Sequence, residues 1–219
     1  MSMTKPNAEQ QVDQVLTEII DDEKQFLTEK RSDYRELLLV PVQVSQPEFE
    51  SSVRGFTRDV SAHGVCLIMP QPFRQGVEVQ INLVGKISQV RGFAKCCWSS
   101  RFGDVYWVSG WQLTEGIPVG RLLKEDHSVE AEQRNSDRLQ AAVPVGIYLL
   151  GKTRRIPGFT RNLSHAGLSL ISKVETQPNQ VADLEIMRLN GESGRVEGRC
   201  RWVKQYGEDH WVSGWQFTQ

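Results

Sequence analysis

An internal repeat constrains the fold more than any other feature, because the chain contains one pattern twice. Residues 55–68 read GFTRDVSAHGVCLI, and residues 158–171 read GFTRNLSHAGLSLI, at an offset of 103 positions. Near the end of each copy, WVSGWQLT at 107–114 matches WVSGWQFT at 211–218, now at an offset of 104. This repeat predicts two copies of one small domain, with one residue inserted in a hairpin turn of the second copy.

Each copy carries the alternating pattern of β-strands. Apolar residues alternate with polar or turn residues at Val77, Val79, Ile81 and Leu83, and again at Val143, Val145, Ile147 and Leu149. This period of two places one side of a strand in a core and the other in water. Several short strands separated by turns predict a small barrel or a sandwich. We expect the equivalent tryptophans to pack in these cores, namely Trp98 and Trp202, Trp107 and Trp211, and Trp111 and Trp215.

The segments outside the repeat differ in kind. Residues 8–28 predict an amphipathic helix of about five turns, because apolar residues recur at helical spacing at Val12, Val15, Leu16, Ile19 and Ile20. The apolar stripe must dock on a barrel or on a partner helix, and the second option would give a homodimer. Residues 116–133 predict a linker with a short helix. We divide the chain into a helical segment, a first barrel, a linker and a second barrel, at 1–28, 29–115, 116–130 and 131–219.

The composition narrows the class of protein. A chain of 219 residues with 39% hydrophobic residues is ordinary for globular domains. The longest apolar stretch, residues 141–151, is interrupted by a proline and is shorter than the ~18 residues of a membrane span. The N-terminal residues have no apolar region of a signal peptide. We therefore expect a cytoplasmic protein without membrane insertion. The net charge of -1 argues against binding a nucleic acid polymer.

Two polar clusters recur in both copies. One is Arg-x-x-x-Arg before the first strand, and the other is Asp/Asn-x-Ser-x-x-Gly at the start of an apolar strand. Taken alone, the first is typical of a solvated helix face and the second of a turn. Their joint recurrence points to a shared site, because folding does not explain two arginines at fixed spacing. The candidate residues are Arg31, Arg35, Asp59, Ser61 and Gly64, and their equivalents Arg134, Arg138, Asn162, Ser164 and Gly167.

These residue types fit an anionic ligand with a purine base. The guanidinium group presents a rigid fork of donors that matches a phosphate or the O6/N7 edge of guanine. Its plane also stacks on a base. Asp or Asn accepts hydrogen bonds from guanine N–H groups, Ser adds a hydroxyl, and Gly lets a ligand approach the backbone. We expect a mobile arginine-bearing segment that closes on a rigid barrel surface.

Both copies resemble the PilZ domain, the bacterial receptor module for cyclic di-GMP. The family pattern is RxxxR in an N-terminal linker plus [D/N]xSxxG on the barrel, and both copies have every key position. The resemblance covers residues 29–115 and 131–219. It implies a mainly β fold of two consecutive six-stranded antiparallel barrels behind the N-terminal amphipathic helix. It also implies cyclic di-GMP as the ligand, with no cofactor. We expect the second copy to lack the C-terminal helix that is usual in the family, and helix 8–28 is one candidate to cover that barrel.

The positions of the motifs suggest how a signal is produced. Arg31 and Arg35 lie between the N-terminal segment and the first barrel, and Arg134 and Arg138 lie between the barrels. Closure of these segments on bound ligand would change the arrangement of the domains and present a new surface to an unidentified protein partner. A ligand can do so only by as much as it prefers the closed state.

Three rival functions are an enzyme, a single-strand nucleic-acid barrel and a tandem scaffold. Enzyme activity is disfavoured because the four histidines (His63, His127, His165 and His210) form no repeated nucleophile–base set and no phosphate-binding glycine loop is present. A metal site is disfavoured because the four cysteines show no zinc-ligand spacing. A single-strand nucleic-acid barrel is disfavoured by the near-zero charge. The alternative kept open is a tandem β-barrel interaction scaffold with weak or no nucleotide binding.

Overall fold

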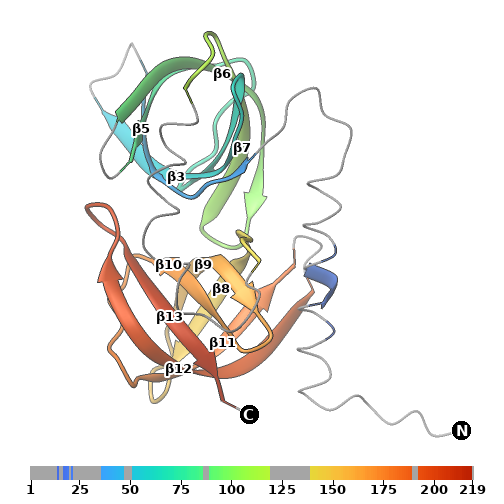
Figure 1. The fold of residues 1–219 in the computed structure, drawn as a ribbon, viewed down its shortest axis with the longest axis vertical. Helices are drawn as coiled ribbons and strands as arrows, with labels where there is room; N and C mark the ends of the chain where they lie inside the picture. The colour runs from blue at the N-terminus through green and yellow to red at the C-terminus, as the bar shows by residue number, and fades with distance from the viewer. Residues whose placement is uncertain are drawn as a thin grey trace, which may run out of the picture. The chain divides into compact units, whose positions relative to one another are not determined.

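The computed structural model describes Gln14, residues 17–19, Asp21, and residues 36–46, 51–85, 89–118, 139–188 and 192–218. The chain divides into two compact units. One is Lys30–Asn135, and the other joins Met1–Glu29 to Ser136–Gln219. Each unit contains one closed antiparallel barrel of six strands (Figure 1). The two barrels confirm the predicted mainly β fold.

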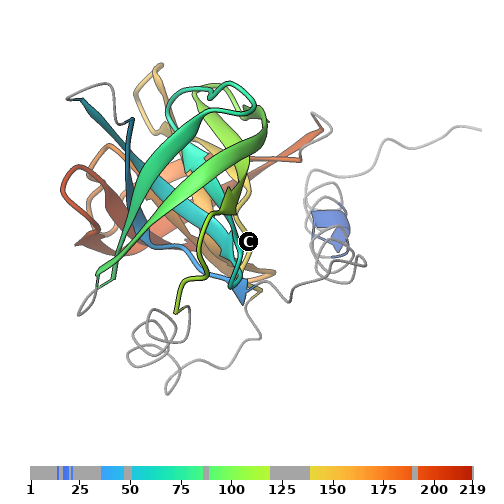
Figure 2. The ribbon, with the colours of Figure 1, turned by 90° about the horizontal axis from the view of Figure 1, so that it is seen from above.

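The first barrel closes through strands β3-β2-β5-β6-β7-β4, with β4 pairing back onto β3, while the short β1 pairs with the end of β3 along the same edge as β2. Its long strands β6 and β7 run side by side in both ribbon views (Figures 1 and 2). The strands are β1 (Glu36–Leu37), β2 (Pro41–Ser45), β3 (Ser52–Val60), β4 (Gly64–Met69), β5 (Glu78–Val84), β6 (Gln89–Phe102) and β7 (Tyr106–Leu113).

The second barrel closes in the same order, β10-β13-β12-β11-β8-β9. The inserted residue lies where the sequence predicts it, because Val84 pairs with Gln89 in the first barrel whereas Met187 pairs with Ser193 in the second. The strands are β8 (Pro144–Leu149), β9 (Arg155–Ser164), β10 (Gly167–Ser172), β11 (Val181–Met187), β12 (Ser193–Gln205) and β13 (Trp211–Phe217).

Each barrel has its own apolar core. Val79, Ile81 and Leu83 of β5 are buried in the first core, as their alternation predicts, and Val145, Ile147 and Leu149 occupy the second core. Burying such side chains contributes about 1.5–3 kcal/mol each. Ile117, which the sequence analysis assigns to the linker, is 7% exposed and packs in the first core.

The expectation that all six tryptophans are core residues holds for Trp111 and Trp215, and it is wrong for Trp98 and Trp202. Trp107 and Trp211 are half-buried. Trp111 and Trp215 are buried, but Trp98 is 44% exposed. It sits on the outer face of its barrel against Gly110, where an added Cβ would collide with the indole. Trp202 lies in the same way against Gly214 and is half-buried. The two glycines therefore make room for an outward tryptophan in each copy.

The N-terminal segment is described only in part. Gln14, residues 17–19 and Asp21 are helical, with Ile19 buried while Gln14 and Asp21 are exposed. The predicted length of five turns lies mostly outside the described residues and stays a prediction. Within the described part of the chain, no helix has the length and apolar character to cross a membrane.

Candidate functional site

The Asp-x-Ser-x-x-Gly motif of the first copy forms the hairpin turn between β3 and β4. Asp59 lies near the end of β3 and Ser61 directly after it, and both side chains are buried. The Ser61 backbone N–H donates to the Gly64 carbonyl at 2.8 Å, and the Ser61 hydroxyl donates to the same oxygen at 3.3 Å. The serine therefore closes the turn, as a short polar side chain does in many turns.

The second copy repeats this turn between β9 and β10. The Ser164 hydroxyl donates to the Gly167 carbonyl at 3.0 Å. A side chain at Gly167 would collide with the backbone oxygen of Trp215 on the neighbouring strand β13. Glycine is thus required at this position by close packing of two backbones, besides any role toward a ligand.

The chain that follows each arginine motif pairs with the strand that carries the other motif. Glu36, the residue after Arg35, pairs with Val60, which stands between Asp59 and Ser61. Leu139, the residue after Arg138, pairs in the same register with Leu163. In each copy, the residue that follows the arginine motif therefore lies beside the strand that carries the other motif, at one end of a barrel.

The predicted arginines themselves lie outside the described residues, and their side chains are not placed. These are Arg31, Arg35, Arg134 and Arg138. The described members are Asp59, Ser61, Gly64, Asn162, Ser164 and Gly167, and in each copy they share one hairpin turn.

A threonine that the sequence analysis did not single out holds the incoming segment in each copy. The Thr160 hydroxyl donates to the Ala141 carbonyl and accepts from the Val143 backbone N–H at 2.9 Å. Thr57 does the same with the Leu38 carbonyl and the Val40 N–H. Both threonines are 0% exposed. The signal was present, because GFTR is identical in the two copies.

Thr160→Val should lower the free energy of unfolding of the second barrel by about 1–3 kcal/mol. Valine keeps the shape but removes both hydrogen bonds, which leaves the Ala141 carbonyl and the Val143 N–H without this partner in a buried place. Denaturant unfolding measures the change. Thr218→Val is the matched control, since Thr218 bonds Glu197 on the exposed surface. Equal losses for the two variants would contradict the role of Thr160.

The two copies differ in the burial of the Asp or Asn of the turn motif and of the arginine before it. Asp59 is 0% exposed, whereas its equivalent Asn162 is half-buried. The arginines that precede these two residues also differ. Arg58 is 4% exposed, whereas the Arg161 guanidinium lies 5.7 Å from the centre of the Tyr206 ring. Such an arginine–aromatic contact is mildly stabilising.

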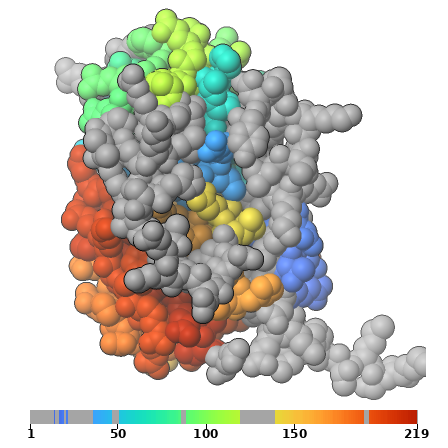
Figure 3. All heavy atoms as spheres, viewed as in Figure 1, coloured from blue at the N-terminus to red at the C-terminus, as the bar shows by residue number. Residues whose placement is uncertain are grey.

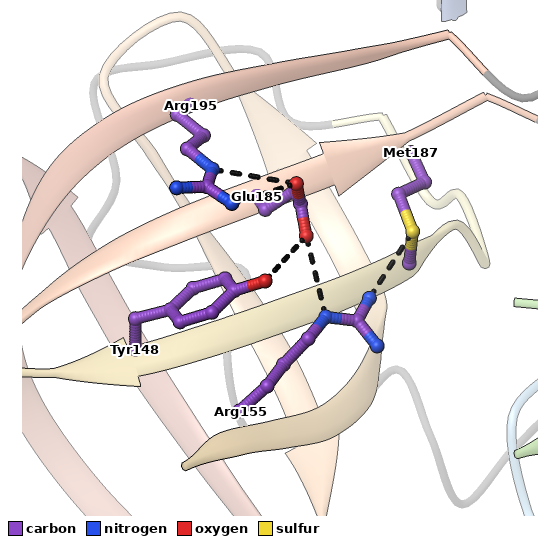
Figure 4. A network of polar contacts seen from close by, with 5 residues as sticks. All are labelled: Tyr148, Arg155, Glu185, Met187 and Arg195. Carbon is purple, nitrogen blue, oxygen red and sulfur yellow. Dashed lines mark hydrogen bonds and ion pairs between the residues drawn. The ribbon is translucent and has the colours of Figure 1, made fainter. Parts of the chain in front are cut away.

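A polar network on the outer face of the second barrel has no counterpart in the first copy (Figure 4). Glu185 of β11 accepts hydrogen bonds from the Tyr148 hydroxyl at 3.0 Å, from Arg155 Nε at 3.2 Å and from Arg195 Nη2 at 3.1 Å. Burial by itself would raise the pKa of Glu185, but the bonds from Tyr148 and Arg195 outweigh it and lower the pKa. This network ties four strands together and stabilises the barrel.

Three further buried groups have shifted pKa values, namely His210, Cys96 and Cys200. Burial lowers the pKa of His210, whose Nδ1 lies 2.7 Å from Asp209. Burial also raises the pKa of the Cys96 and Cys200 thiols, which disfavours the reactive thiolate. Among the described residues, no group of three or more His, Cys, Asp or Glu side chains could hold a metal ion.

The fold and the repeated turn define the class of the protein as a tandem of small six-stranded barrels, each with a polar hairpin turn at one end. The family model of the PilZ domain matches residues 29–118 and again residues 132–219. The chain therefore belongs to the PilZ family. No curated protein matches the sequence.

Several solved structures are similar to the chain over most of its length. PlzA of Borreliella burgdorferi, solved in complex with c-di-GMP, is 15% identical, with 92% of each chain covered and a TM-score of 0.34. YcgR from Escherichia coli, also solved in complex with c-di-GMP, is 10% identical, with 98% of this chain and 84% of that chain covered and a TM-score of 0.35. The Bacillus subtilis inhibitor of motility MotI/DgrA is 12% identical, with 82% and 88% covered and a TM-score of 0.34.

Proposed function

We propose that the protein is a cyclic di-GMP receptor with one nucleotide site on each barrel, and that it signals by binding and not by catalysis. Membership of the PilZ family supports this function. The single observation that carries it is the shared pairing of Glu36 with Val60 and of Leu139 with Leu163. That pairing brings the residue after each arginine motif to the strand that carries the other polar residues, which supports a shared site.

Each proposed site combines five side chains or backbone positions. The two arginines bind the phosphates and stack on a guanine, because the guanidinium group offers parallel donors and a flat face. Asp59 or Asn162 accepts from the guanine N–H groups, and the serine and glycine turn lets the base approach the backbone. The proposed residues are Arg31, Arg35, Asp59, Ser61 and Gly64 in the first site, and Arg134, Arg138, Asn162, Ser164 and Gly167 in the second.

The output of the receptor is part of the proposal. Bound ligand would hold an arginine segment against a barrel surface. Because each arginine segment joins two parts of the chain, this binding would change the arrangement of the domains. The changed arrangement would expose a surface for a protein partner in the cytoplasm, and a homodimer through the N-terminal helix stays a prediction. Small-angle scattering profiles that coincide with and without ligand would count against this output.

Calorimetric titration with cyclic di-GMP tests the function. We expect two classes of site in the intact protein, and Arg35→Ala and Arg138→Ala should each weaken one class by about 10- to 150-fold, because each removes a charge-assisted contact of about 1.5–3 kcal/mol. The double variant should weaken both. Arg74→Ala is the control, since Arg74 is exposed at the opposite end of the first barrel. An intact protein without binding would leave the tandem scaffold as the function.

A further inference from the structure

One apolar residue of the second core comes from outside the second repeat. Ile19 of the N-terminal helical segment is 3% exposed and belongs to the same core as Ala141, Leu163 and Trp215, while every other member of that core lies between residues 139 and 217. The described core residues of the first barrel all come from residues 38–117, so none is contributed by the N-terminal helical segment.

A charged contact beside Ile19 holds the segment in the same place. Glu18 accepts from Arg188 Nη1 at 2.5 Å, and Arg188 also donates to Glu192 at 2.6 Å. The Arg188 side chain is only 15% exposed, which makes this pair less screened by water than most surface pairs. The helical residues lie next to the ends of β11 and β12 in Figure 1, and their outer atoms are visible in blue in Figure 3.

Strand pairing places this contact at the end of the barrel that carries the second polar motif. Arg188 follows β11 at the end where Ile186 pairs with Val145 of β8, and Pro144 of the same strand pairs with Phe159 of β9. From there β9 continues to the motif turn at Ser164. The docked segment and the proposed nucleotide site are therefore neighbours at one barrel end.

Leu163 links the docked segment to the site. Its side chain is 0% exposed in the core that includes Ile19, and it stands between the motif residues Asn162 and Ser164. Its backbone exchanges two hydrogen bonds of 2.9 Å with Leu139, the residue after Arg138. Because Ile19 and Leu163 belong to one core, we expect loss of the Ile19 side chain to weaken the packing beneath the pairing of Leu139 with Leu163.

We propose that the N-terminal segment around Ile19 is a cap that sets the affinity of the second nucleotide site. This inference rests on the proposed function. Because coupling between two binding events is reciprocal, ligand at the second site strengthens docking of the cap, and docking of the cap strengthens ligand binding. The first site lacks this control, since its barrel end is closed by Ile117, whose N–H bonds the Ala62 carbonyl of the first motif turn at 3.0 Å.

The test measures each site separately in the full chain. The Arg35→Ala background weakens the first site, so that the remaining tight binding belongs to the second site. In this background, Ile19→Ala and Glu18→Ala should each lower the affinity for cyclic di-GMP by about 5- to 150-fold. In an Arg138→Ala background, the same changes should leave the first site within about twofold. Thr17→Ala is the matched control, because Thr17 is an exposed residue of the same segment.

Two further measurements keep the inference falsifiable if Ile19→Ala impairs folding. Arg188→Ala should match Glu18→Ala in effect, and the double variant should lower the affinity no further than either single change. Hydrogen exchange at residues 17–19 should slow when the second site is saturated. Unchanged second-site affinity in folded variants, or unchanged exchange, would overturn the cap while leaving the receptor intact. Absence of nucleotide binding in the intact chain would overturn the receptor and the cap together.

Discussion

Trp111→Ala is expected to lower the free energy of unfolding of the first barrel by about 3–5 kcal/mol, the usual cost of removing a large buried aromatic side chain. Trp111 is 1% exposed, meets Phe73 edge to face with ring centres 5.1 Å apart, and donates from its indole N–H to Ser109 at 2.8 Å. In denaturant unfolding, the first barrel should unfold at a lower denaturant concentration, while the midpoint of the second barrel stays unchanged, because each barrel has a separate core.

Trp98→Ala in the same barrel is the matched control. It removes the same side chain from an outer face where 44% of the residue is exposed, so the loss should be about 1 kcal/mol or less. If the two variants lost equal stability, the assignment of Trp98 to the outside of the barrel would be wrong.

Gly167→Ala is expected to destabilise the second barrel by about 3 kcal/mol and to abolish tight binding at the second site. The new methyl group would collide with the Trp215 carbonyl and lie 3.1 Å from the Gln216 Cα, and backbone atoms cannot turn aside as a flexible side chain can. Thermal unfolding together with titration in the Arg35→Ala background measures both effects.

Gly116→Ala serves as the control for the effect of adding a methyl group. The nearest atom to a Cβ at Gly116 is the Ala62 oxygen at 3.5 Å, an ordinary contact, so the change should stay within about 0.5 kcal/mol. A mild effect of Gly167→Ala would mean that β10 and β13 can separate at the motif turn.

The repeat predicted two copies of one domain and the extra residue between β11 and β12, and the strand alternation predicted a barrel or a sandwich. The resemblance to the PilZ family narrowed this choice to two six-stranded barrels. Trp98 shows where the strand alternation fails. The register of β6 against β7 shifts between Cys96 and Trp98, so Cys97 is an extra residue that forms a β-bulge. A bulge moves every later side chain to the other face. Regular alternation from the buried Cys96 would place the Trp98 side chain inside the barrel. Because of the bulge, the Trp98 side chain lies outside it.

The candidate site could be predicted in part for a similar reason. The turn residues are local in sequence, so their motif was recognisable, and the pairing of Leu139 with Leu163 needed the structure. The network around Glu185 joins side chains of four strands and is absent from the first copy, where Asn82 occupies the equivalent position, so no repeat revealed it. Docking of Ile19 was one of two options that helical periodicity left open.

The place of Ile19 has a consequence for how the chain folds as it is made. The segment leaves the ribosome before either barrel, yet its nearest partners in the second core begin at Leu139, about 120 residues later. Contacts of such long sequence separation form slowly, because the intervening chain must first be ordered. The first barrel has its complete core by Ile117 and can fold during synthesis. Ile19 lacks its core partners until the second barrel has been synthesised, so its burial requires that the second barrel has folded.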